Sequence, residues 1–186
     1  MLLLGEVASW SWVWSLVAPE VWPWTLDCPP DCVVLSVVEA WLLPSAADWP
    51  VVAVLDEASL PEVMSAVADA AAWARRQANW VGAWGYSSGG ALAVLCAPLF
   101  DALALTFPHL DLTVLPDDVW AGVDEFPTAL PPTFIQVASN DTIAGRYEWA
   151  EALAIKVTEY VSEHRVSTPK VARQRVMDVA EFLKGV

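Results

Sequence analysis

The chain has 186 residues, which suits one domain able to bury a core without disulfides or a metal, and we expect residues 1–186 to form that domain. Hydrophobic residues make up 56% and charged residues 17%, a composition that excludes intrinsic disorder. The 23 acidic residues outnumber the 9 Lys and Arg residues, and the formal charge of −14 argues against binding to nucleic acid or anionic lipid.

The first segment predicts an antiparallel hairpin. Trp10, Trp12 and Trp14 alternate with smaller residues, a period of two that indicates a strand with one aromatic face. A turn follows, and residues 21–26 form the second expected strand.

The rest of the chain alternates between strand and helix patterns. Short apolar runs predict strands at residues 33–38, 50–55, 80–84, 102–107, 132–138 and 155–161. Helices are expected at residues 61–76, 91–99 and 145–154, and a last helix has Ala172, Val176, Val179 and Leu183 on its inner face. Ser59 and Glu62 have the spacing of a capping box before the first helix. This alternation predicts an α/β fold with a mostly parallel sheet and helices on both faces.

The hydrophobicity does not indicate a membrane protein. The longest uncharged stretch, residues 77–100, is long enough to span a bilayer, but its four glycines and paired serines suit a strand, a turn and a helix better. The N-terminus has neither a basic region nor a small-residue cleavage site, so we expect no signal peptide. A cytoplasmic location and no membrane span follow as expectations.

Three cysteines are too few for a disulfide framework. Cys28 and Cys32 would pair only in an oxidising compartment, and free thiols are the favoured state. Cys96 lies in an apolar run and is interpreted as a core residue. We expect no metal and no organic cofactor.

The segment Gly85-Tyr86-Ser87-Ser88-Gly89-Gly90 carries the clearest chemical signal. A G-x-S-x-G sequence between a buried strand and an apolar helix predicts a tight turn that exposes a serine hydroxyl above the sheet. Side chains at Gly85 and Gly89 would collide with neighbouring backbone in such a turn. Ser87 is therefore the candidate nucleophile, and a simple Gly/Ser connection is the alternative.

A serine nucleophile needs a base, and the base needs a group that orients it. In this arrangement the chain order is Ser, acid, His. His164 follows a late strand, and Asp141 follows the strand that ends at residue 138, so both lie at the carboxyl edge of the predicted sheet. His109 precedes this acid and fits the role less well. Asp117 and Asp118 are reserve candidates for the acid.

These segments together resemble the α/β-hydrolases, and among them the hormone-sensitive-lipase-type esterases. Residues 56–62 resemble the D-Y-R-L-A-P-E stretch of that family, and residues 85–90 resemble its G-D-S-A-G-G turn with Tyr in place of Asp. Residues 107–112 are similar to its S-P-W-L-D-L segment, and residues 131–141 to the strand that leads to its catalytic acid. His164 falls where the family has His-Gly-Phe. The tyrosine also resembles acyl-thioesterase domains.

The resemblance implies a carboxylic-ester hydrolase with a small-molecule ester substrate and a Ser87-His164-Asp141 triad. The backbone N–H groups of Ser88 and Val38 are the expected oxyanion donors. The chain departs from the family because Glu39 and its neighbours replace the H-G-G-G oxyanion loop, and because the cap is reduced. Thioester hydrolysis is one alternative, and a non-catalytic binding protein with an α/β-hydrolase-like fold is the other. The oligomeric state is left open.

Overall fold

The computed structural model describes residues 32–39, 51–54, 59–76, 78–112, 120, 122–142, 147–164 and 167–186. Six strands in these residues form one sheet in the order β2-β1-β3-β4-β5-β6, and every neighbouring pair is parallel. The strands are β1 (Cys32–Glu39), β2 (Val51–Val54), β3 (Trp80–Tyr86), β4 (Ala102–Thr106), β5 (Thr133–Ala138) and β6 (Val157–Tyr160). The predicted N-terminal hairpin and Cys28 lie outside the described residues.

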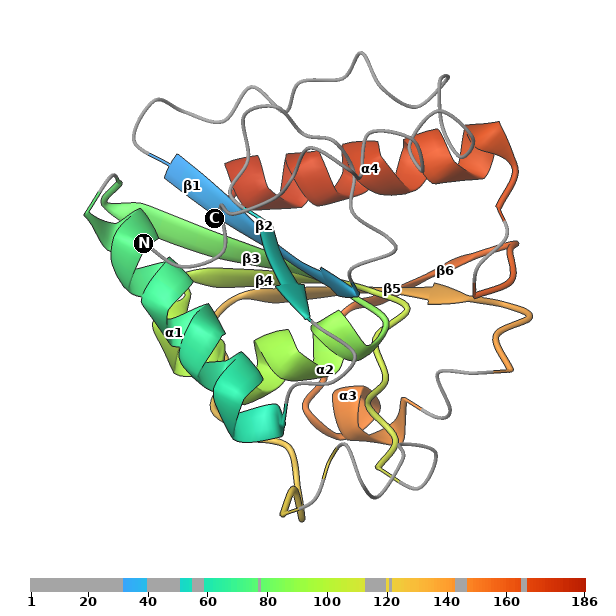
Figure 1. The fold of residues 1–186 in the computed structure, drawn as a ribbon. Coiled ribbons are helices and arrows are strands. Elements are labelled where there is room, and N and C mark those ends of the chain that lie inside the picture. Colours follow the sequence, from blue (N-terminus) through green and yellow to red (C-terminus); the bar gives the residue numbers. More distant parts are fainter. Residues whose placement is uncertain are drawn as a thin grey trace, which may run out of the picture.

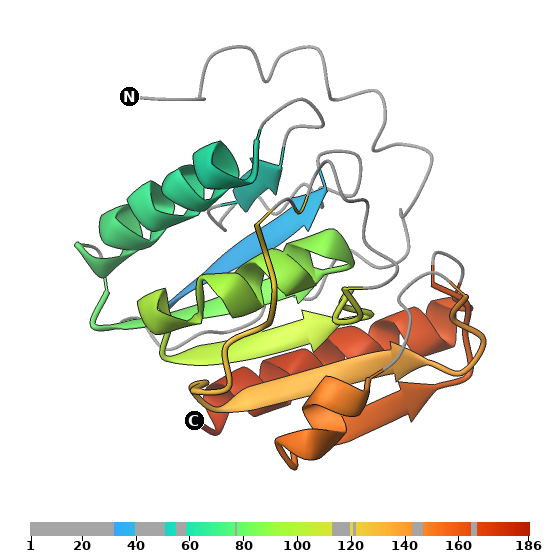
Figure 2. The ribbon, with the colours of Figure 1, turned by 90° about the horizontal axis from the view of Figure 1, so that it is seen from below.

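Helices cover both faces of the sheet, as the sequence predicts. Helices α1 (Leu60–Arg75), α2 (Ser88–Leu95) and α3 (Glu148–Ala152) lie on one face, and α4 (Pro169–Lys184) lies on the other (Figure 1). Viewed from below, the strands run in a common direction with α1, α2 and α3 in front of them (Figure 2). The carboxyl ends of the strands therefore meet at one edge, where parallel sheets place their ligand sites.

The predicted capping box begins α1. The Ser59 backbone N–H donates to Glu62 Oε2 at 2.9 Å, and the Ser59 hydroxyl donates to the same oxygen at 2.6 Å. These hydrogen bonds lower the pKa of the Glu62 carboxyl, so the charged form stabilises the first turn. One side of α1 is buried against the sheet through Val63, Val67, Ala71 and Ala74.

Two groups of buried residues hold the layers together. The larger lies between the sheet and the helices α1 and α2, and Cys96 belongs to it, where burial raises the pKa of its thiol to about 11. The smaller joins α4 to the sheet through Ala102, Ala104, Phe134, Val179 and Leu183. Of the predicted inner face of the last helix, the final two residues are buried and the first two are half-buried.

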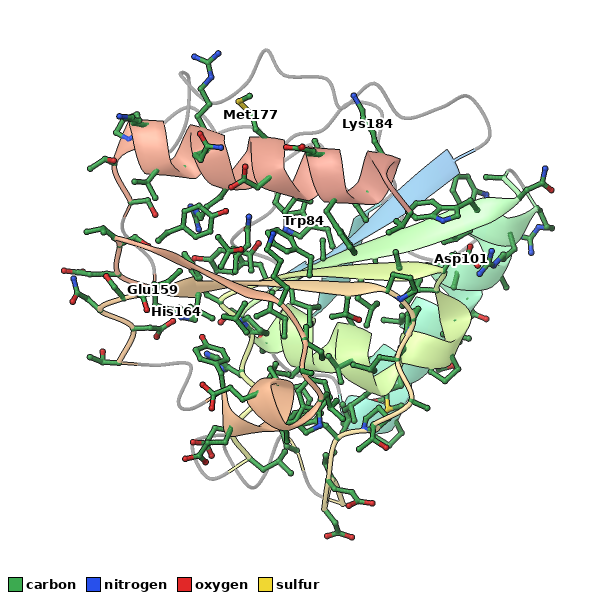
Figure 3. The ribbon with its side chains drawn as sticks, turned by 180° about the vertical axis from the view of Figure 1, so that it is seen from behind. Trp84, Asp101, Glu159, His164, Met177 and Lys184 are labelled. Atoms are coloured by element: carbon green, nitrogen blue, oxygen red, sulfur yellow. The ribbon has the colours of Figure 1, made fainter. Side chains whose placement is uncertain are left out.

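A chain of polar side chains crosses the sheet on the α4 face. Trp84 Nε1 donates to Thr106 Oγ1 at 3.0 Å, and Thr106 Oγ1 donates to Gln136 Oε1 at 2.8 Å. The Gln136 amide donates to Tyr160 Oη at 3.1 Å and to the Arg175 carbonyl at 2.8 Å. Figure 3 shows Trp84 in the layer between α4 and the sheet. Gln136 is fully buried and both of its amide hydrogens have acceptors, so its burial leaves no amide donor unpaired.

The described parts of the connection from β4 to β5 contain little regular structure. In its described parts, residues 107–112, 120 and 122–132, the chain forms turns and extended segments and neither helix nor strand. No helix within the described ranges is both long enough and apolar enough to cross a membrane.

Candidate active site

A single strained residue separates β3 from α2. Strand β3 ends at Tyr86, α2 begins at Ser88, and Ser87 between them has φ 56° and ψ −125°. Residues other than glycine rarely adopt this conformation, and it persists only where the surrounding structure enforces it. The Ser87 N–H donates to the Thr106 carbonyl at 3.1 Å, which fixes the turn to the neighbouring strand β4.

Glycines allow the strand and the helix to approach each other at this turn. A Cβ atom on Gly85 would lie 2.6 Å from both the Gly89 carbonyl oxygen and the Gly90 Cα. The predicted collision at Gly85 is therefore confirmed. A Cβ atom on Gly90 would lie 2.6 Å from the Cβ of Pro108, so this glycine admits the loop that follows β4.

The structure brings the three predicted triad residues together. Ser87 Oγ lies 2.8 Å from His164 Nε2, and His164 Nδ1 lies 2.7 Å from Asp141 Oδ2. The loops after β5 and β6 remain paired beyond the strands, because the Ser139 and Asn140 N–H groups donate to the carbonyls of Tyr160 and Ser162. These hydrogen bonds hold Asp141 and His164 at the same edge of the sheet as Ser87. Figure 3 shows the position of His164.

The Asp141–His164 pair is buried. Each of the two side chains is 3% exposed. A buried carboxylate without a partner is costly, so the His164 ring, which offers a hydrogen-bond donor at Nδ1, stabilises it. Tyr147 lies close to this pair, and burial together with the Asp141 charge raises the pKa of its hydroxyl.

A second set of contacts, made by Tyr86 and Arg175, holds the loop that carries His164. The Tyr86 hydroxyl donates to the His164 carbonyl oxygen, and the Arg175 guanidinium of α4 hydrogen-bonds to Tyr86. The Arg175 Cζ lies 4.6 Å from the centre of the Phe107 ring, a cation–π contact. Burial lowers the pKa of Arg175, and the interaction with Tyr86 opposes this shift. No pattern in the sequence predicts that Tyr86 or Arg175 holds the histidine.

His109 also reaches Ser87. Its Nε2 lies 3.2 Å from Ser87 Oγ, and its ring centre lies 5.2 Å from that of His164. The chain order Ser, acid, His disfavours His109 as the base, because His109 precedes the candidate acid. His109 follows β4, and β4 lies next to β3 in the sheet. Adjacent parallel strands open their loops at the same edge, so this position in the chain could have predicted that His109 lies near Ser87.

The predicted oxyanion donors lie on two elements, the helix α2 and the strand β1. Ser88 is the first residue of α2, directly after Ser87. Val38 lies within β1 and pairs with Ala53 of β2, one residue before the strand ends at Glu39. Asp117 and Asp118, the reserve acids, lie outside the described residues.

A hollow of about 250 Å³ lies against α3. Its lining starts at Leu110, the residue after His109, and combines apolar with acidic side chains: Leu110, Leu112, Phe126, Trp149, Asp111, Asp124, Glu125 and Glu148. A larger hollow of about 450 Å³ lies against the C-terminal residues and the start of β5, at the opposite edge of the sheet. Neither hollow is lined by Ser87, His109, Asp141 or His164.

Comparison with known proteins places the fold. No family model and no curated protein matches the sequence. Solved structures match over most of the chain. One is a protein from Xanthomonas campestris pv. campestris that is assigned to the α/β superfamily of hydrolases. It has a TM-score of 0.59 at 18% identity, and the match covers 83% of this chain and 98% of that chain. An esterase from Pyrobaculum calidifontis has a TM-score of 0.58 at 16% identity, covering 83% and 76%.

A third structure extends the same pattern. Est1E from Butyrivibrio proteoclasticus has a TM-score of 0.53 at 15% identity, covering 83% of this chain and 90% of that chain. The chain therefore has an α/β-hydrolase fold, and its structural neighbours include hydrolases and esterases. At these identities the similarity defines the fold, and the particular likeness to hormone-sensitive-lipase-type esterases rests on the sequence motifs alone.

Proposed function

We propose that this protein is a serine hydrolase that cleaves small carboxylic esters. The observation that carries the proposal is the hydrogen-bonded series from Ser87 Oγ through His164 to Asp141, with distances of 2.8 and 2.7 Å, on a strained strand–helix turn. The esterases among the structural neighbours support the reaction class.

In this mechanism Ser87 Oγ attacks the acyl carbonyl carbon while its proton passes to His164 Nε2. Asp141 holds the His164 tautomer with hydrogen on Nδ1 and stabilises the imidazolium that forms. His164 then gives the proton to the leaving alcohol. In the second half, water gives a proton to His164 and attacks the acyl-enzyme carbonyl carbon, and His164 returns the proton to Ser87 Oγ as the carboxylic acid leaves. The Ser88 N–H donates to the oxyanion at the positive end of α2, and Val38 is the proposed backbone donor on the other side.

Covalent labelling tests this function directly. A fluorophosphonate probe is expected to modify the wild-type protein at one position, which peptide mass spectrometry should locate at Ser87. Ser87→Ala should remain unlabelled, and Ser139→Ala, which removes an exposed serine from the loop near the site, is the matched control that should label fully. A folded wild-type protein that the probe does not modify would contradict the proposal and favour the binding-protein alternative.

Tyr86→Phe tests the support behind the histidine. The substitution removes the hydroxyl that donates to the His164 carbonyl and keeps the ring packed edge-on against Phe107, 5.8 Å between ring centres. We expect kcat for ester hydrolysis to fall about tenfold while KM changes little, because a small misplacement of the base slows proton transfer. Steady-state kinetics with a p-nitrophenyl ester measure this, and a change in KM alone would show that Tyr86 acts on substrate binding instead.

A further inference from the structure

Two imidazole rings converge on the nucleophile, and the proposed mechanism uses only one of them. His164 Nε2 lies 2.8 Å and His109 Nε2 lies 3.2 Å from Ser87 Oγ. His164 carries its hydrogen on Nδ1, where it donates to Asp141, so its Nε2 accepts the serine proton. The serine hydroxyl has one hydrogen, and when that hydrogen points to His164, as the proposed proton transfer requires, a lone pair of Oγ is left for His109.

This arrangement sets the hydrogen position on His109. A favourable contact with the lone pair of Ser87 Oγ requires an N–H on His109 Nε2. In that form the ring is a hydrogen-bond donor toward the reacting atoms, while proton transfer is left to His164. In these forms His109 donates to Ser87 Oγ and His164 accepts from it.

The loop that carries His109 is fixed to the turn that carries Ser87. The His109 backbone N–H donates to the Ser87 carbonyl oxygen at 3.1 Å, and Pro108 packs against Gly90 in the first turn of α2. Phe107, where the chain leaves β4, is fully buried and has a φ of 49°. A second strained residue thus lies next to the strained Ser87, and it directs the chain so that His109 reaches the nucleophile.

We propose that the His109 side chain donates a hydrogen bond to the oxyanion of the tetrahedral intermediate. This inference rests on the proposed ester hydrolysis. When the Ser87 Oγ–carbon bond forms, the carbonyl π electron pair moves to the carbonyl oxygen and the serine proton moves to His164. The oxyanion and Oγ then share one carbon, so a donor within hydrogen-bond reach of Oγ needs only a small shift to meet the oxyanion. His109 keeps its proton throughout.

The charge on the oxyanion makes this donor effective. Hydrogen bonds to an ionised acceptor are about twice as strong as those between neutral groups, so the His109 contact strengthens as the charge develops. Oxyanion-hole donors include histidine side chains, and removal of one donor costs on the order of 10²–10³ in kcat. His109 would approach the oxyanion from the β4 side of Ser87, and the Val38 N–H would approach it from the β1 side.

His109→Phe and His109→Gln together test the proposal. Phenylalanine keeps a planar ring without a donor, and glutamine keeps an N–H on a flexible side chain. We expect His109→Phe to lower kcat on a p-nitrophenyl ester about 10²–10³-fold with KM nearly unchanged, and His109→Gln to recover at least tenfold of that loss. A trifluoromethyl ketone, whose adduct with Ser87 carries an oxyanion, should bind His109→Phe more weakly by a similar factor.

Each other outcome overturns this inference. Unchanged kcat in His109→Phe, or equal loss in both variants without weaker ketone binding, shows that His109 makes no oxyanion contact. A loss in His109→Phe as complete as in Ser87→Ala, with His164→Ala still active, identifies His109 as the base instead. If the wild-type protein neither hydrolyses the ester nor binds the ketone, the proposed function fails and this inference fails with it. A Ser87-dependent activity that is indifferent to His109 overturns this inference alone.

Discussion

Ser87→Ala, His164→Ala and the double variant are each expected to reduce kcat for hydrolysis of a p-nitrophenyl ester by the same large factor, on the order of 10⁶. The reason is that the serine and the histidine act as one unit, so removal of either leaves the other without a function. Asp141→Asn is expected to cost less, about 10⁴-fold, because the amide can still contact His164 but no longer stabilises the imidazolium. Single-turnover and steady-state kinetics on the purified variants measure these factors.

The double variant is the informative control. Independent contributions would multiply, so a double variant far slower than either single variant would show that Ser87 and His164 do not share one step. Activity that persists unchanged in Ser87→Ala would show that another group, or a contaminating enzyme, performs the reaction. Circular dichroism and a thermal melt should accompany His164→Ala, because this change leaves the buried Asp141 carboxylate without its histidine partner.

Gly85→Ala is expected to produce the largest loss of stability among single-methyl additions, about 3 kcal/mol or more. The added Cβ would lie 2.6 Å from the backbone of Gly89 and Gly90, and backbone atoms cannot rotate away as a side chain can. The variant must separate β3 from α2, which also displaces Ser87. Urea unfolding followed by tryptophan fluorescence measures the free energy of unfolding.

Gly185→Ala is the matched control for that experiment. Its Cβ would lie 3.5 Å from the Glu181 carbonyl oxygen and 3.6 Å from that of Phe182, ordinary contact distances at the end of α4. Its free energy of unfolding should stay within about 0.5 kcal/mol of the wild type. A Gly85→Ala protein as stable as the control would show that the turn relaxes without strain.

The sequence predicted the elements of the described fold well and their limits near the site less well. Periodicity placed every described strand within two residues, because the strands are short and β1 to β5 consist mainly of apolar residues. The helix expected at residues 91–99 instead begins at Ser88 and ends at Leu95, followed by a 3₁₀ turn over Ala97–Leu99. The α-helix ends early because Pro98 lacks an N–H and cannot continue it. The α-helix begins early because Gly85, Gly89 and Gly90 let the strand and the helix lie in direct contact.

The site was predictable where chain order and sheet topology agree. Ser87, Asp141 and His164 follow three different strands, and a parallel sheet brings those ends together. The contact of His109 with Ser87 was not predicted, because motif order excluded it as the base and left no reason to assign another function. The link from Arg175 through Tyr86 to His164 depends on how α4 lies across the sheet, and no pattern in the local sequence specifies that angle.

The polar chain across the α4 face has a consequence for how the strands find their alignment during folding. Strands made of interchangeable apolar residues, such as Ala102–Thr106, carry little information about which residue should face which. A slip of one residue in β5 would move Gln136 to the α2 face, where its amide would lose Thr106, Tyr160 and the Arg175 carbonyl. A misaligned sheet therefore buries hydrogen-bond donors without acceptors, which costs free energy of folding. This cost favours the alignment in which the ends of β3, β5 and β6 bring Ser87, Asp141 and His164 together.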